Sequence, residues 1–133
     1  MRPSLLAGSA LLALTAIGCA PALTPTEVCQ RRVDQNCERN FECRTDKDTS
    51  SFQYAYGATV DECKAKHYAS NDCGALTEEA QNCRGPNEGK STFNAGTFNE
   101  CQEALAALSC QEFVNQEFFG TAQPPAVCGR ICD

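Results

Sequence analysis

The chain has 133 residues, enough for one domain, and its 11 basic and 17 acidic residues give a formal net charge of −6. It has no run of Lys or Arg that would neutralise phosphates, so the composition argues against a nucleic-acid partner. From Cys19 onward, Leu, Ile, Val, Phe and Met make up only about 15 % of the residues, a level that by itself predicts disorder. A folded domain therefore needs cross-links to supplement its small core.

The N-terminal segment has the order of an export signal. Arg2 precedes an apolar run from Leu5 to Ile17, which is shorter than the roughly 20 residues of a membrane-spanning helix. The run closes with Ala16-Ile17-Gly18-Cys19, which resembles the lipobox of bacterial lipoproteins. The resemblance implies removal of residues 1–18, lipidation of Cys19 and a lipid-anchored protein of the bacterial cell envelope.

The residues after Cys19 bear on where the protein is delivered. The residue directly after Cys19 is Ala20 and not aspartate, and in lipoproteins this implies sorting to the outer membrane. Residues 19–24 would then form a lipidated tether. A second cleavage site remains open, because Ala20-Pro21-Ala22 suits the ordinary signal peptidase. Cleavage there would discard Cys19 and leave a periplasmic or freely secreted protein.

Setting Cys19 aside leaves an even number of cysteines, which in an exported chain is typical of a disulfide framework. The ten cysteines expected to form disulfides are Cys29, Cys37, Cys43, Cys63, Cys73, Cys83, Cys101, Cys110, Cys128 and Cys132. We therefore predict a mainly α, small disulfide-rich helical domain over residues 25–133.

Helix-capping signals divide the first half of this domain. Thr24-Pro25-Thr26-Glu27 combines an N-cap, a first-turn proline and a capping-box glutamate, and predicts a helix with one apolar face. Residues 44–58 predict a loop with a brief extended piece at 52–56, where aromatic residues alternate with others. A second capping box at Thr59–Glu62 predicts a helix that runs to about Ser70.

The second half carries similar signals. Thr77 predicts a short helix over 78–83, and a capping box at Thr97–Glu100 predicts the most amphipathic helix of the chain. Ser109 is expected to cap a further helix or turn through Phe119. These landmarks echo those of the first half, so the chain is interpreted as two helix-loop-helix repeats, 25–73 and 75–119, with a tail at 120–133. Coincidence among common residues is the alternative.

Antiparallel helix hairpins suggest which cysteines pair, because the end of one helix lies near the start of the next. This geometry predicts the pairs Cys37–Cys63, Cys83–Cys101 and Cys29–Cys73. It assigns no partner to the remaining four, which are Cys43, Cys110, Cys128 and Cys132.

Motifs for catalysis or metal binding are weak. The chain has no Cys-x-x-Cys, so we expect no metal site, and no cofactor motif is present. His67, the only histidine, is expected to be a packing or surface residue, because the sequence marks no catalytic partner for it. Asp46 and Asp48 have the spacing of the start of a calcium loop, but the further ligands are missing.

The aromatic residues leave one further choice. They could form an exposed contact patch, but a chain this poor in leucine needs them in its core, and we favour the core. They are Phe52, Tyr54, Tyr56 and Tyr68.

These observations favour a non-enzymatic binding or structural lipoprotein, anchored through Cys19, that presents a rigid surface to an envelope protein. An exported enzyme or enzyme inhibitor with an unrecognised site is the main alternative. A freely secreted cysteine-rich protein is the third.

Overall fold

The structure, a computed structural model, describes residues 22–120 and 122–133, so the signal segment and Cys19 lie outside the described residues. Helices dominate this part of the chain, and its one strand-like pairing is an isolated antiparallel bridge between Phe93 and Cys132. The α-helices are α1 (Pro25–Cys43), α2 (Ser50–Tyr56), α3 (Val60–Ser70), α4 (Ala95–Ala106) and α5 (Cys110–Val114). The prediction of a small, mainly α, disulfide-rich domain is confirmed.

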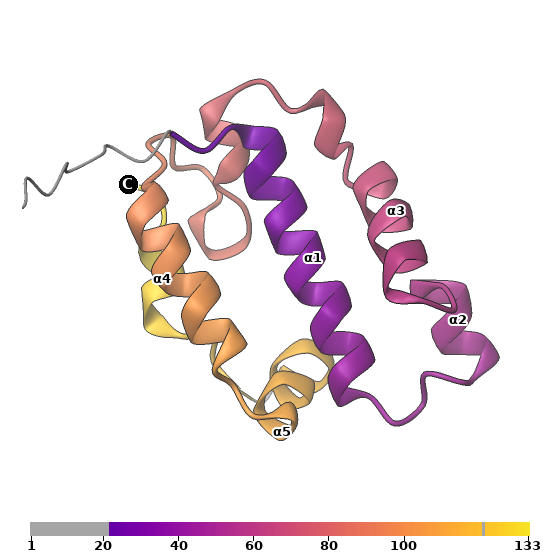
Figure 1. The fold of residues 1–133 in the computed structure, drawn as a ribbon. Coiled ribbons are helices and arrows are strands. Elements are labelled where there is room, and N and C mark those ends of the chain that lie inside the picture. Colours follow the sequence, from indigo (N-terminus) through magenta and orange to yellow (C-terminus); the bar gives the residue numbers. More distant parts are fainter. Residues whose placement is uncertain (1–21, 121) are drawn as a thin grey trace, which may run out of the picture.

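Helix α1 lies at the centre of the fold, with α3 along one side and α4 along the other (Figure 1). Its start matches the sequence prediction. The Thr24 Oγ1 atom accepts a hydrogen bond from the Glu27 amide at 3.2 Å, and the Glu27 carboxylate accepts one from the Thr24 amide at 2.7 Å. This capping box fixes where the central helix begins, and therefore which of its faces meets each neighbour.

Two core clusters lie on opposite sides of α1. The α4 cluster, between α1, α4 and the C-terminal segment, consists of Val28, Cys83, Phe98, Cys101, Cys128, Ile131 and Cys132. The α3 cluster, between α1 and α3, consists of Cys29, Val33, Cys37, Cys63 and Cys73. Cysteines make up most of both clusters, so the cross-links also supply much of the buried apolar volume that the composition lacks.

All ten predicted cysteines form disulfides. They pair as Cys29–Cys73, Cys37–Cys63, Cys43–Cys110, Cys83–Cys132 and Cys101–Cys128. Two predicted pairs, Cys29–Cys73 and Cys37–Cys63, are confirmed, and both join α1 to the hairpin arm that follows it.

The predicted pair Cys83–Cys101 is wrong. Cys83 bonds to Cys132, and Cys101 bonds to Cys128. The C-terminal segment does not trail away as a tail. It forms the 3-10 helix η5 (Ala126–Arg130) and packs against α4. This packing places Cys128 next to Cys101 and Cys132 next to Cys83.

Three local predictions need correction. The piece at 52–56 is helical, because Thr49 caps α2 and its side chain accepts a hydrogen bond from the Phe52 amide at 3.3 Å. The short helix predicted at 78–83 is the 3-10 helix η2 (Glu79–Asn82). Helix α4 begins at Ala95, because Asn94, and not Thr97, is the N-cap.

The two predicted repeats differ in structure. The first begins with α1, which has 19 residues, and the second with η2, which has four. A helix of four residues is too short to form a hairpin arm like α1. The predicted cap at Ser109 is confirmed, and α5 continues into the π-helical turn η4 (Asn115–Phe119).

Candidate ligand-binding cavity

A cavity of about 460 Å³ opens between α1, α4, the 3-10 helices η2 and η3 (Gly85–Asn87), and the C-terminal segment. This volume lies in the range of small-molecule sites, roughly 300–1,000 Å³. The aliphatic side chains that line it are Val28, Val33, Leu76, Leu105 and Ile131.

Disulfides form part of the cavity wall. Cys29, which is bonded to Cys73, lines it on the α1 side, and the bonded pair Cys101–Cys128 lines it on the α4 side. Each bridge ties its wall to a second element. The cavity is therefore framed partly by cross-linked backbone.

Two arginines bring positive charge to this cavity. The Arg32 Nη2 atom donates a hydrogen bond to the Asn82 carbonyl at 2.6 Å, and the Arg32 guanidinium lies 5.5 Å from the centre of the Phe98 ring. The Nε atom of Arg84, which is exposed, donates to the Gln81 carbonyl at 3.2 Å. Burial, and then the nearby charge of Arg84, lower the pKa of Arg32.

No acidic residue balances these charges inside the cavity. Among the described residues that line it there is no Asp or Glu, and neither arginine forms a salt bridge within the described ranges. Glu117 borders two smaller hollows that also touch Arg32, and its carboxylate accepts a hydrogen bond from Asn36 at 3.1 Å. The cavity is therefore locally positive in a chain of net negative charge.

Two buried carboxamides in the wall differ in their bonding. The Asn87 side chain donates to the Cys128 carbonyl at 2.7 Å and accepts from the Cys132 amide at 3.4 Å. The Asn82 side chain is only 1 % exposed, and neither of its polar atoms has a partner among the described residues. Burying an unpaired amide costs free energy, so the Asn82 side chain lowers the stability of the folded domain.

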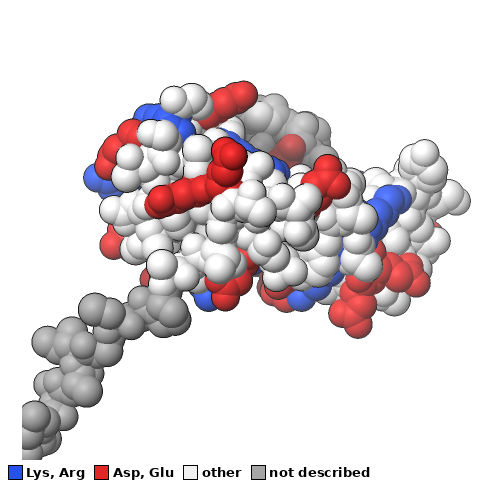
Figure 2. Space-filling view, turned by 90° about the horizontal axis from the view of Figure 1, so that it is seen from above, with Lys and Arg blue, Asp and Glu red and all other residues white. Residues whose placement is uncertain are grey.

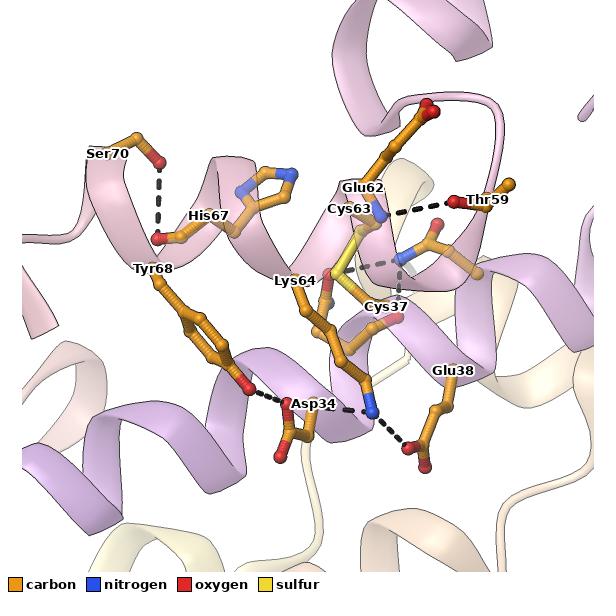
Figure 3. Close-up of a disulfide and its surroundings, with 12 residues drawn as sticks. Asp34, Cys37, Glu38, Thr59, Glu62, Cys63, Lys64, His67, Tyr68 and Ser70 are labelled. Atoms are coloured by element: carbon orange, nitrogen blue, oxygen red, sulfur yellow. Dashed lines mark hydrogen bonds and ion pairs between the residues drawn. A yellow bond between two sulfur atoms is a disulfide. The ribbon is translucent and has the colours of Figure 1, made fainter.

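A polar cluster joins α1 and α3 beside the Cys37–Cys63 disulfide (Figure 3). Lys64 contacts Glu38 at 2.7 Å and Asp34 at 3.7 Å, and the Tyr68 hydroxyl donates a hydrogen bond to Asp34. Burial and this hydrogen bond raise the pKa of Tyr68 to about 12. The cluster holds two helices together, and its groups already bond to one another.

The histidine singled out by the sequence lies outside both the polar cluster and the cavity. In Figure 3 the His67 ring points away from Tyr68 and Asp34. It packs near the Tyr56 ring, with 5.6 Å between ring centres, and its Nε2 atom is buried without a partner among the described residues. This placement agrees with the packing role predicted for it.

The aromatic residues do not gather into one exposed patch. Phe52 is buried against Phe41 and Tyr56, and Tyr68 is half-buried. Tyr54 is the exception, with 85 % of its surface exposed. The preference for a core role is confirmed for Phe52, the most deeply buried of the four.

The candidate metal ligands are not brought together. Asp46 forms an ion pair with Arg44, and Cys128 and Cys132 bond to different cysteines. Within residues 22–120 and 122–133, no group of three or more His, Cys, Asp or Glu side chains is arranged to hold a metal ion.

Sequence reasoning missed Arg32, which the helical spacing could have indicated. Arg32 follows Val28 by four residues and Cys29 by three, so all three lie on one face of α1. Asn82 and Arg84 carry no comparable signal, because Asn82 ends the short 3-10 helix η2 and Arg84 lies in the connection between η2 and η3.

The chain matches no family model, no curated protein and no solved structure. In the described part of the chain, no helix is both long enough and apolar enough to cross a membrane.

Proposed function

We propose that this protein is a non-enzymatic binding lipoprotein of the bacterial cell envelope, and that its α1–α4 cavity holds a small-molecule ligand. The observation that carries the proposal is the cavity itself, which has the volume of a ligand site and is walled by two disulfides. A preformed site avoids the entropy cost of ordering its walls when the ligand binds.

The molecular surface offers less support for a protein partner than the cavity offers for a small ligand. Acidic and basic side chains are interspersed on the face shown in Figure 2, without a large patch of one sign. Among the described residues, Tyr54 is the one large hydrophobic side chain that is exposed. A single exposed tyrosine is ordinary for a soluble surface.

The proposed lipid anchor would hold the cavity close to a membrane. Leu23 already packs against the α4 cluster, so the free tether from Cys19 is shorter than the 19–24 segment predicted. Four residues extend at most about 14 Å. Lipoproteins carry two or three acyl chains on this cysteine, and two or more chains anchor a protein durably.

A fragment panel tests binding in the cavity. Neutral, acidic and basic fragments are screened by ligand-observed NMR against the oxidised domain from residue 22 and against Leu105→Trp, which fills the cavity. Leu108→Trp is the matched control, because Leu108 lies just beyond α4 and lines none of the cavities described above. We expect Leu105→Trp alone to weaken binding by at least about tenfold. Absence of any bound fragment, or equal binding by Leu105→Trp, contradicts the proposal.

Intact-mass spectrometry tests the anchor on protein taken from the native envelope. We expect a mature chain that begins at an acylated Cys19, with five disulfides, and Cys19→Ala should move the protein to the soluble fraction. A mature chain that begins after Ala22 without acyl groups would instead show free secretion.

A further inference from the structure

The geometry points to an organic carboxylate with a compact apolar body as the ligand class of the α1–α4 cavity. This inference rests on the proposed function and specifies the chemistry of its ligand. Three properties of the cavity carry it: its unbalanced positive charge, the arrangement of that charge, and its apolar walls.

The charge of the cavity selects the sign of the ligand. Arg32 and Arg84 both border it, and no acidic residue is found among its described lining residues. The two guanidinium groups are close enough to repel each other, since Arg84 lowers the pKa of Arg32. An anion between them would relieve this repulsion and also supply a counter-charge to the half-buried Arg32, which forms no salt bridge with the described residues.

The guanidinium geometry selects a carboxylate. One N–H of Arg32 is used by the Asn82 carbonyl, and its other donors have no partner in the described part of the chain. A planar guanidinium binds a planar carboxylate through two parallel hydrogen bonds. The Asn82 bond and the Phe98 ring hold Arg32 in place, which lowers the entropy lost on binding.

The walls select the rest of the ligand. Beyond the two arginines, the cavity is lined by aliphatic side chains and disulfide-bonded cysteines, together with the carboxamide residues Asn71, Gln81, Asn82, Asn87, Gln102 and Gln116. The aliphatic part of the wall favours an alkyl or aryl body over a free, doubly charged phosphate, whose desolvation apolar atoms would not offset. A singly charged amphiphile matches both parts of the site.

Matched eight-carbon probes test this inference on the oxidised domain by isothermal titration calorimetry. Octanoate, 1-octanol and octylamine share one apolar body and differ in charge. We expect octanoate to bind at least about tenfold more tightly than the other two, and its affinity to fall as salt is added. Inorganic phosphate is included as the competing anion.

Arginine variants connect the charge to the site. Arg84→Gln should weaken octanoate binding about threefold, and Arg32→Gln at least about tenfold, because charge-assisted hydrogen bonds are stronger when shielded from water. Arg130→Gln is the control for net charge, because Arg130 is exposed and lines none of the cavities described above. Arg32→Lys, which keeps the charge but loses the planar fork, should also weaken binding and serves if Arg32→Gln does not fold.

The outcomes separate the two proposals. If 1-octanol, octylamine or phosphate binds as tightly as octanoate, or if Arg84→Gln behaves like Arg130→Gln, the carboxylate inference is overturned while the cavity proposal stands. If none of these probes binds, the carboxylate inference is also overturned. The wider fragment panel and Leu105→Trp then decide the cavity proposal alone.

Discussion

Two buried asparagines in the cavity wall should respond in opposite ways to the same substitution. Asn82 and Asn87 are each 1 % exposed, but within the described residues only the Asn87 side chain has hydrogen-bond partners. Asn82→Leu removes an unpaired buried amide, whose desolvation costs about 1–3 kcal/mol, and the neighbouring cavity has room for the larger side chain. We expect the free energy of unfolding to rise by about 1–2 kcal/mol.

Asn87→Leu has the reverse effect, because it leaves the Cys128 carbonyl and the Cys132 amide without their side-chain partner. We expect a loss of about 2–3 kcal/mol. Urea unfolding with the disulfides intact measures both changes, and each kcal/mol corresponds to roughly 4 °C in Tm for a domain of this size. If both variants lose stability by similar amounts, the Asn82 carboxamide is satisfied and the reasoning fails.

Three further predictions concern the cross-links and the titrating groups. Replacing Cys43 and Cys110 together by Ala opens a loop of 67 residues, whose closure the chain-entropy relation values at about 4 kcal/mol. Because other bridges already shorten this loop, we expect the free energy of unfolding, measured with urea, to fall by about 2–4 kcal/mol. Tyr68 should ionise near pH 12, so the stability it contributes is present below pH 10 and lost as the pH rises toward 12. Absorbance at 295 nm checks this, and Tyr68→Phe should abolish the ionisation step near pH 12. Hydrogen bonds from the Ser109 side chain and backbone lower the pKa of Glu112, so the stability that its carboxylate contributes is present above about pH 4.5 and lost on acidification. Glu112→Gln should flatten this acid dependence of Tm, and an unchanged Tm profile would contradict the prediction.

Sequence reasoning succeeded where a local signal has a local cause. The Thr24 and Ser109 caps are read from adjacent residues, and the same residues form the hydrogen bonds in the structure. Cys29–Cys73 and Cys37–Cys63 follow from α1 packing antiparallel to α3, the next long helix along the chain.

It failed where distant segments decide the structure. The alternation at 52–56 resembles a strand, but Phe52 is buried against Phe41 from α1 and the segment is helical. The Thr49 cap of this helix is a local signal that sequence reasoning overlooked. The pair Cys83–Cys101 fits the local sequence pattern, but each cysteine bonds instead to one in the C-terminal segment, Cys132 or Cys128. The sequence did not predict the cavity for the same reason, because its wall is formed jointly by α1, η2, η3, α4 and the C-terminal segment.

The position of the cysteines along the chain has a consequence for how the protein matures. In a polypeptide that emerges N-terminus first, the partners of Cys29 and Cys37 appear early, whereas those of Cys83 and Cys101 appear only with the last few residues. Until then, Cys83 and Cys101 are available to each other, and any bond between them would have to be exchanged later. Formation of the native cross-links around the cavity thus requires Cys83 and Cys101 either to stay unpaired until Cys128 and Cys132 have been synthesised or to exchange partners afterwards.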